Sequence, residues 1–160
     1  MNEWLKLSEK RRLEILNQVN NQTGLPTDAI EKDWWVTITL KAIFSSKFAQ
    51  HLVFKGGTSL SKAYNLIERF SEDIDLSIDR TMLGFEGELS KTQIKKLRKA
   101  SGNFIVGEFK EELISELEKL GVNKENYNLI FDDEIDDTSD PHRIELEYNS
   151  IVEAGEYIPQ

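Results

Sequence analysis

The amino-acid sequence predicts a single domain of the α/β (α+β) class, in which a small mixed sheet is flanked by helices. Apolar residues recur at the spacing of a helix near the N-terminus, and a short apolar run leads into the pair Gly56-Gly57. Alternating apolar and polar residues over 127–131 and 143–148 are typical of strands. A chain of 160 residues buries a sizeable core, and neither a repeat nor a linker divides it, so residues 1–160 form the predicted domain.

The composition is that of a globular protein, with 39% hydrophobic and 31% charged residues. The sequence has no cysteine, which excludes disulfides and thiolate metal sites and fits a reducing cytoplasm. No apolar run reaches the roughly 20 residues that span a bilayer, and the N-terminus lacks the pattern of a signal peptide. We therefore expect a cytoplasmic location and no membrane partner. The net charge of −9 argues against nonspecific nucleic-acid binding by the whole surface.

Two helices are predicted before the glycine pair. Apolar residues at helical spacing favour a first helix over residues 8 to about 20, which ends at Gly24. Asp28 followed by Glu31 resembles a capping box and opens a second helix that runs to about residue 44. That helix is apolar on most sides, so we expect it in the core. Its two adjacent tryptophans are assigned to core packing rather than to a base-stacking platform.

A strand, a turn, a helix and a second strand follow. Residues 51–54 form the first strand, the glycine pair forms the turn, residues 58–68 form the helix and residues 74–78 form the second strand.

The last third of the chain is predicted as a long helix and a hairpin. Ser90 caps the helix, which extends to Gly121 with weak points at 101–103 and at Gly107. The two C-terminal strands enclose an acidic loop over 132–137, which we assign as a solvated loop because it lacks the glycine and oxygen spacing of a calcium loop.

Two carboxylates, Asp73 and Asp75, lie at the start of the strand that follows the glycine turn. Side chains alternate between the two faces of a strand, so both project the same way while Ile74 and Leu76 face the core. Neighbouring carboxylates repel each other unless a cation lies between them, and their hard oxygens suit Mg²⁺. Asp73 and Asp75 are therefore the predicted catalytic metal ligands.

The glycine turn is the predicted phosphate site. Gly56 and Gly57 lack the Cβ atoms that would keep a phosphate away from the backbone. The hydroxyls of Thr58 and Ser59, with the N–H groups of a helix start, complete an anion site, and Lys62 lies one turn further along. A lone glycine pair is usually a turn, and a lone Asp-x-Asp is usually a strand end or a helix cap. The combination, separated by the length of one helix, favours phosphoryl or nucleotidyl transfer.

These motifs resemble the signature of polymerase-β-like nucleotidyltransferases, in which a glycine turn precedes a helix and an acidic-apolar-acidic strand. Residues 55–64 and 69–76 are most similar to the AbiEii/AbiGii toxin family of prokaryotic toxin–antitoxin and phage-defence systems. The segment Glu31-Lys32-Asp33-Trp34-Trp35-Val36-Thr37 is similar to the first long helix of that family. The resemblance extends over residues 25–80 and implies a polymerase-β-like fold with its active site at the sheet edge.

The resemblance also implies a two-metal site that a third carboxylate on a neighbouring strand completes. Glu145 and Glu147 share one face of the last predicted strand, and Glu147 is preferred because it stands between Leu146 and Tyr148. Two alternatives stay open. In the first, both glutamates belong to the solvated face of an edge strand. In the second, the third carboxylate lies beyond Gln160, because chains of the similar family usually continue further. The present sequence would then correspond to their N-terminal part.

One cluster of basic residues contains no acid and shares a helix with Ile94 and Leu97. It is assigned as a solvated face, with an RNA-facing patch as the alternative, and consists of Lys91, Lys95, Lys96, Arg98 and Lys99.

The predicted function is Mg²⁺-dependent transfer of a nucleoside monophosphate from an NTP to an acceptor hydroxyl, with release of pyrophosphate. The resemblance implies a toxin with an antitoxin protein as partner and RNA, such as a tRNA 3′ end, as acceptor, while protein hydroxyls stay open as acceptors. The alternative is a non-catalytic module of the same fold that binds an antitoxin, RNA or a nucleotide.

Overall fold

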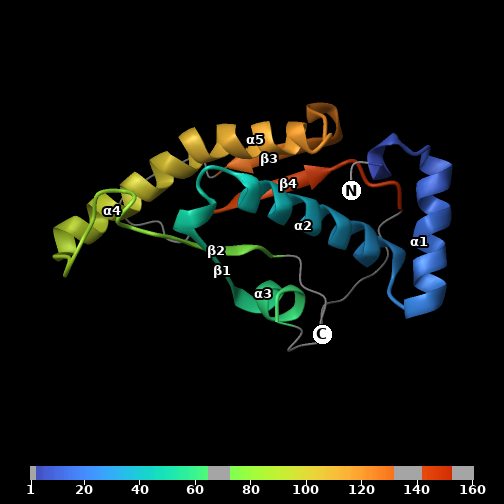
Figure 1. The fold of residues 1–160 in the computed structure, drawn as a ribbon, viewed down its shortest axis with the longest axis horizontal. Helices are drawn as coiled ribbons and strands as arrows, with labels where there is room; N and C mark the ends of the chain where they lie inside the picture. The colour runs from blue at the N-terminus through green and yellow to red at the C-terminus, as the bar shows by residue number, and fades with distance from the viewer. Residues whose placement is uncertain (1–2, 65–72, 132–141, 153–160) are drawn as a thin grey trace.

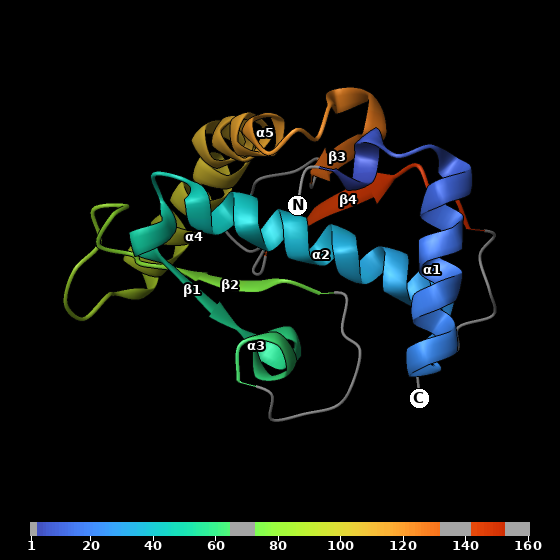
Figure 2. The same ribbon diagram turned by 45° about the vertical axis from the view of Figure 1, so that its right-hand side comes forward.

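A long central helix separates two pairs of strands. The computed structural model describes residues 3–64, 73–131 and 142–152. Helix α2 (Thr27–Ser45) runs through the middle of the molecule, with one antiparallel strand pair on each side of it (Figures 1 and 2). The first pair is β1 (Leu52–Lys55) with β2 (Asp75–Ile78), and the second is β3 (Tyr127–Phe131) with β4 (Ile144–Tyr148).

The other helices surround this centre. Helix α1 (Glu9–Thr23) crosses the N-terminal end of α2, the short helix α3 (Gly56–Lys62) continues from β1, and α5 (Lys110–Lys119) lies on the side of β3 and β4 (Figure 1). Helix α4 (Lys91–Phe104) extends to the end of the molecule opposite α1. Single turns of 3₁₀ helix occur at Trp4–Lys6 (η1), Ala49–His51 (η2) and Lys124–Asn126 (η4).

The predicted α+β class is confirmed. The described strands are arranged as two separate antiparallel pairs, where the sequence predicts one small mixed sheet. Each pair has its own apolar face toward the common core, so neither needs to join the other to bury it. The predicted hairpin of residues 127–131 and 143–148 is confirmed, and its acidic loop lies outside the described residues.

The core lies between α2, α5 and the inner faces of both strand pairs. Trp35, on α2, is 4% exposed, and its ring stacks on Tyr148 of β4 with 4.9 Å between the ring centroids. Trp34 meets Trp35 edge-on at 5.1 Å. The assignment of the tryptophan pair to core packing is confirmed. Residues from both strand pairs that pack against this core include Ile74, Leu76, Ile78, Leu129, Leu146 and Tyr148.

Local signals account for both ends of α1 and for the start of α4. The Ser8 hydroxyl accepts a hydrogen bond from the Arg11 N–H, and α1 ends at Gly24 in the left-handed conformation (φ 74°). Ser90 and Gln93 form a reciprocal capping box at the start of α4. Helix α4 is continuous through residues 101–103, so the weak point predicted there is wrong. The irregularity lies around Gly107, the other predicted position, where a π-helical segment, η3 (Ile105–Phe109), joins α4 to α5.

The predicted capping box of Asp28 and Glu31 is wrong. Helix α2 starts at Thr27 with Pro26 as its N-cap, so the box position belongs to Ala29, and Glu31 lies beyond the first turn. Glu31 is instead 1% exposed, and its carboxylate accepts hydrogen bonds from the Ser150 hydroxyl (2.6 Å) and the Ile151 N–H (3.2 Å). Among the described residues no helix is long and apolar enough to cross a membrane.

Candidate functional site

The glycine turn and the carboxylate strand are neighbours in space. Strand β1 ends at Lys55, whose Cα partner across the antiparallel pair is Asp75. Gly56 follows at once with φ 76°, a conformation that residues with a Cβ rarely adopt. A Cβ on Gly56 would lie 1.9 Å from Oδ2 of Asp75, so only glycine allows the backbone to approach this carboxylate. The two motifs therefore form one site.

Asp73 and Asp75 have the predicted orientation. Both are exposed, whereas Ile74 and Leu76 are partly buried and pack against the core. Exposed carboxylate oxygens at the edge of a strand pair are suitable ligands for Mg²⁺, which commonly binds one or two carboxylates together with substrate phosphates. The described residues contain no group of three His, Cys, Asp or Glu side chains that could hold a metal ion. Asp73 and Asp75 are carboxylates of the kind that could hold a Mg²⁺ ion together with a bound nucleotide, and their role as metal ligands stays a prediction.

The hydroxyls of Thr58 and Ser59 point inward. Thr58 is fully buried and donates to the backbone carbonyl of Asp73, which fastens the start of α3 to the approach of β2. Ser59 is 4% exposed and donates to the Gly56 carbonyl at 2.8 Å. Both hydroxyl protons therefore already have backbone acceptors, one before β2 and one within the turn. Phosphate contacts by these two hydroxyls stay a prediction, and the backbone N–H groups at the start of α3 are the turn's other donors.

Lys62 reaches α2. Its Nζ lies 2.6 Å from Oδ1 of Asp33 and donates to the Thr37 hydroxyl at 2.9 Å. The predicted contact of Lys62 with a triphosphate stays a prediction. Sequence reasoning missed Asp33 and Thr37, although their spacing of one helical turn places them on the same face of α2 and could have marked them as a pair.

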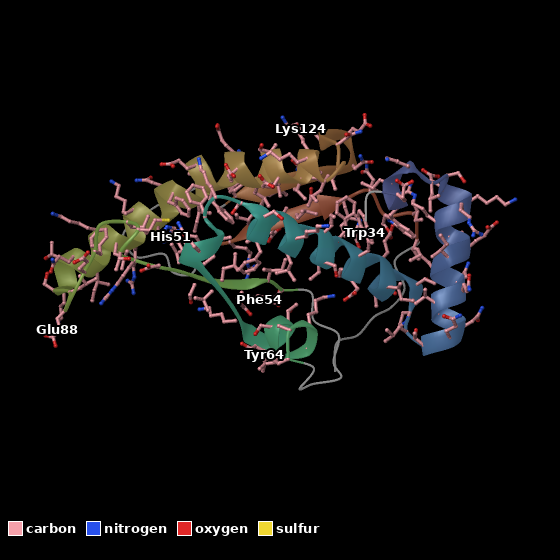
Figure 3. The ribbon with its side chains drawn as sticks, viewed as in Figure 1. Trp34, His51, Phe54, Tyr64, Glu88 and Lys124 are labelled. Atoms are coloured by element: carbon pink, nitrogen blue, oxygen red, sulfur yellow. The ribbon has the colours of Figure 1, made fainter. Side chains whose placement is uncertain are left out.

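Glu147 and Glu145 lie on the other strand pair. Glu147 accepts a hydrogen bond from the Asn128 amide at 3.3 Å, and Glu145 is 3.8 Å from the Arg143 guanidinium. Their neighbours in β4 face the core, so the two glutamates project outward, and β4 lies across α2 from β2. Figure 3 shows the same separation, with Tyr64 beside α3 and Lys124 before β3 on opposite sides of α2.

Glu147 lies in the wall of an open hollow of ≈ 600 Å³. The other residues that line this hollow are Glu125, Tyr127, Asn128, Tyr148 and Asn149. The structure brings Asp75 to the glycine turn but does not bring Glu147 to Asp73 and Asp75. The role of Glu147 as the third carboxylate stays a prediction.

Comparison with known proteins gives one match. The family model described as nucleotidyl transferase AbiEii toxin, type IV TA system, matches residues 38–157. No curated protein and no solved structure matches the chain. The matched range covers well over half of the sequence and includes the glycine turn, α3 and both aspartates. The chain therefore belongs to the AbiEii family of nucleotidyl transferase toxins of type IV toxin–antitoxin systems.

Proposed function

We propose that this protein transfers a nucleoside monophosphate from an NTP to an acceptor hydroxyl and that Asp73 and Asp75 hold the Mg²⁺ ion that the transfer requires. The observation that carries this proposal is the approach of the Asp75 carboxylate to the Gly56 backbone, because it brings the proposed metal ligand next to the proposed phosphate turn. A triphosphate bound at that turn brings its own oxygens next to the carboxylate pair. Family membership supports the transferase class.

The residues of the site have different proposed roles, which depend on where they lie in the turn. Gly56 and Gly57 leave the backbone open to the phosphates, and the N–H groups at the start of α3 bind their oxygens. Thr58 and Ser59 hold the turn in shape from inside. Bound Mg²⁺ would offset the negative charge of the triphosphate and of the leaving pyrophosphate. The acceptor oxygen forms a bond to the α-phosphorus, the bond to the bridging oxygen breaks, pyrophosphate leaves, and the hydroxyl proton passes to water.

RNA, with a tRNA 3′ end as the first acceptor to test, is the proposed substrate class, and a protein hydroxyl is the second. The proposed setting is the cytoplasm, with an antitoxin as protein partner and a role in phage defence. Glu147 is the proposed third carboxylate. Since it lies on the other strand pair, its contribution is tested separately from that of Asp73 and Asp75.

The test uses purified protein with each of the four α-³²P-labelled NTPs, Mg²⁺ and bulk RNA. Wild type should label RNA, and Asp73→Asn or Asp75→Asn should abolish labelling without loss of the fold. Glu88→Gln is the control, because Glu88 is an exposed carboxylate outside both strand pairs. Labelling by Asp75→Asn at the wild-type rate would refute the metal assignment.

The same assay separates the two functional classes. Glu147→Gln should stop transfer if Glu147 completes the site, whereas Glu145→Gln should matter less. Wild-type protein that binds NTP with Mg²⁺ but labels neither RNA nor protein would instead identify a non-catalytic nucleotide-binding module.

A further inference from the structure

Helix α3 is attached to the rest of the molecule by polar contacts. Its seven residues are all described, and none of them belongs to the apolar core. Its two buried residues are Thr58 and Ser59, while Leu60 is 40% exposed. At its N-terminal end the Thr58 hydroxyl binds the Asp73 carbonyl, and at its C-terminal end Lys62 binds α2. The orientation of α3 therefore depends on hydrogen bonds more than on buried apolar area.

In the contact between α3 and α2, each hydrogen-bond donor has its own acceptor. The Thr37 hydroxyl donates to the backbone carbonyl of Asp33 at 2.7 Å, so its oxygen is left to accept from the Lys62 ammonium at 2.9 Å. Oδ1 of Asp33 accepts from the same ammonium at 2.6 Å. Two of the three Lys62 donors are thus directed to one turn of α2. The side chain of Lys62 is 23% exposed and that of Asp33 is 46% exposed, so water screens this ion pair in part.

We propose that Asp33 and Thr37 are positioning residues that hold α3, and with it the Gly56–Gly57 turn, through Lys62. The inference rests on the proposed function only for its catalytic consequence, since neither α2 residue touches the turn itself. When the ion pair is broken, α3 loses its attachment to α2 at the C-terminal end and keeps only the bond of Thr58 to the Asp73 carbonyl among the side-chain contacts described above that join it to another element. Nucleotide binding at the turn then requires the helix to be reordered first.

Hydrogen exchange tests the positioning without any requirement for activity. Asp33→Asn, Thr37→Val and Lys62→Met should each speed amide exchange in residues 56–62 about three- to tenfold, while exchange in α4 stays unchanged. Lys62→Arg should restore most of the protection, because a guanidinium also pairs with a carboxylate. The control is Lys41→Met, which removes an exposed lysine from the same helix α2. Asp33→Asn/Lys62→Met should exchange no faster than Lys62→Met, since both remove one contact.

Kinetics test the consequence for the proposed reaction. Asp33→Asn and Thr37→Val should raise KM for the NTP about three- to tenfold with a smaller change in kcat, whereas Lys41→Met changes neither. Exchange at residues 56–62 that is unaffected by Asp33→Asn, or that rises equally in α4, would overturn the positioning role. Absence of transfer by wild type would refute the proposed function alone, because the exchange result stands without it.

Discussion

The carboxylate of Asp75 lies directly against the α-carbon of Gly56. A Cβ on that glycine would be 1.9 Å from Oδ2 of Asp75 and 2.7 Å from its Cγ, distances that no real contact allows. The glycine of the proposed phosphate turn therefore also makes room for the carboxylate that we propose as a metal ligand. The absence of a side chain at Gly56 is thus required by its contact with Asp75, whatever binds at the turn.

Gly56→Ala should displace the Asp75 carboxylate. The new methyl group must push the side chain aside, and the positive φ of 76° adds about 1–2 kcal/mol of backbone strain. We expect loss of Mg²⁺-dependent NTP binding in calorimetric titration, together with a fall of that size in the free energy of unfolding.

Gly24→Ala is the matched control for this substitution. Gly24 has nearly the same φ, 74°, but nothing lies within 4 Å of the Cβ position. It should lose about as much stability as Gly56→Ala and keep full NTP binding. Equal NTP affinity in the two variants would contradict the contact between Gly56 and Asp75.

Thr58→Val should weaken the attachment of α3 to the backbone at Asp73, just before β2. The substitution keeps the shape of a buried side chain but removes the donor to the Asp73 carbonyl, which should cost about 1–3 kcal/mol in urea unfolding and weaken Mg²⁺-NTP binding. Thr58→Ser keeps the hydroxyl and should keep the affinity. Ser61→Ala is the control, because among the described residues the Ser61 hydroxyl binds only the Thr58 carbonyl of the same helix, at 3.2 Å. If Ser61→Ala lowers the affinity as much, the bond to Asp73 has no special role.

Local patterns predicted the elements and the orientation of the aspartates, since both follow from residues close in sequence. The alternation of Asp73, Ile74, Asp75 and Leu76 needs only the period of a strand. Ser90 likewise caps α4 through a residue three positions away.

The unpredicted features depend on how distant elements pack. The pairing of Lys62 with Asp33 joins helices that no periodicity relates, and the placement of Glu147 depends on the side of α2 that its hairpin occupies. Asp28 and Glu31 have the spacing of a capping box, but α2 begins before Asp28, so Glu31 lies beyond the first turn and its side chain is buried. The spacing of residues in the sequence can identify such residues as candidates, but it does not predict which residue each of them contacts in the folded protein.

The stack of Trp35 on Tyr148 should be a major source of stability. Trp35→Ala should lower the free energy of unfolding by about 3–5 kcal/mol, because it removes a large buried ring. A double-mutant cycle of Trp35→Leu and Tyr148→Leu should give a coupling of about 0.5–1.5 kcal/mol in urea unfolding. Tyr64→Leu is the control, since Tyr64 is 66% exposed and its replacement should change stability by less than about 0.5 kcal/mol. A coupling near zero would show that the rings contribute area alone.

Asp79 should give the protein an acid-dependent component of stability. The hydrogen bond from the Thr81 N–H holds the pKa of Asp79 below its ordinary value of 3.8, and the Thr81 hydroxyl and nearby His51 lower it further. Because the folded-state pKa is the lower one, this contribution is complete above about pH 3.8 and is lost as the pH falls through the folded-state pKa.

Asp79→Asn tests this sign. The variant should be less stable than wild type in urea at pH 7, and the difference should shrink as the pH falls below 3.8. Carboxyl NMR of wild type should show Asp79 titrating below its ordinary value. A stability difference that grows on acidification would contradict the lowered pKa.

Glu31 should fasten the segment after β4 to α2. Its buried carboxylate accepts from the Ser150 hydroxyl and the Ile151 N–H, and the amide in Glu31→Gln has one acceptor oxygen and turns a donor toward donors. We expect Glu31→Gln to cost about 1–3 kcal/mol in urea unfolding and Ser150→Ala about 1 kcal/mol. The double variant should lose less than the sum, because both changes remove the same contact. Glu88→Gln, at the exposed far end of the molecule (Figure 3), is the control and should be nearly neutral. Strict additivity of Glu31→Gln and Ser150→Ala would show that the carboxylate and the hydroxyl act independently.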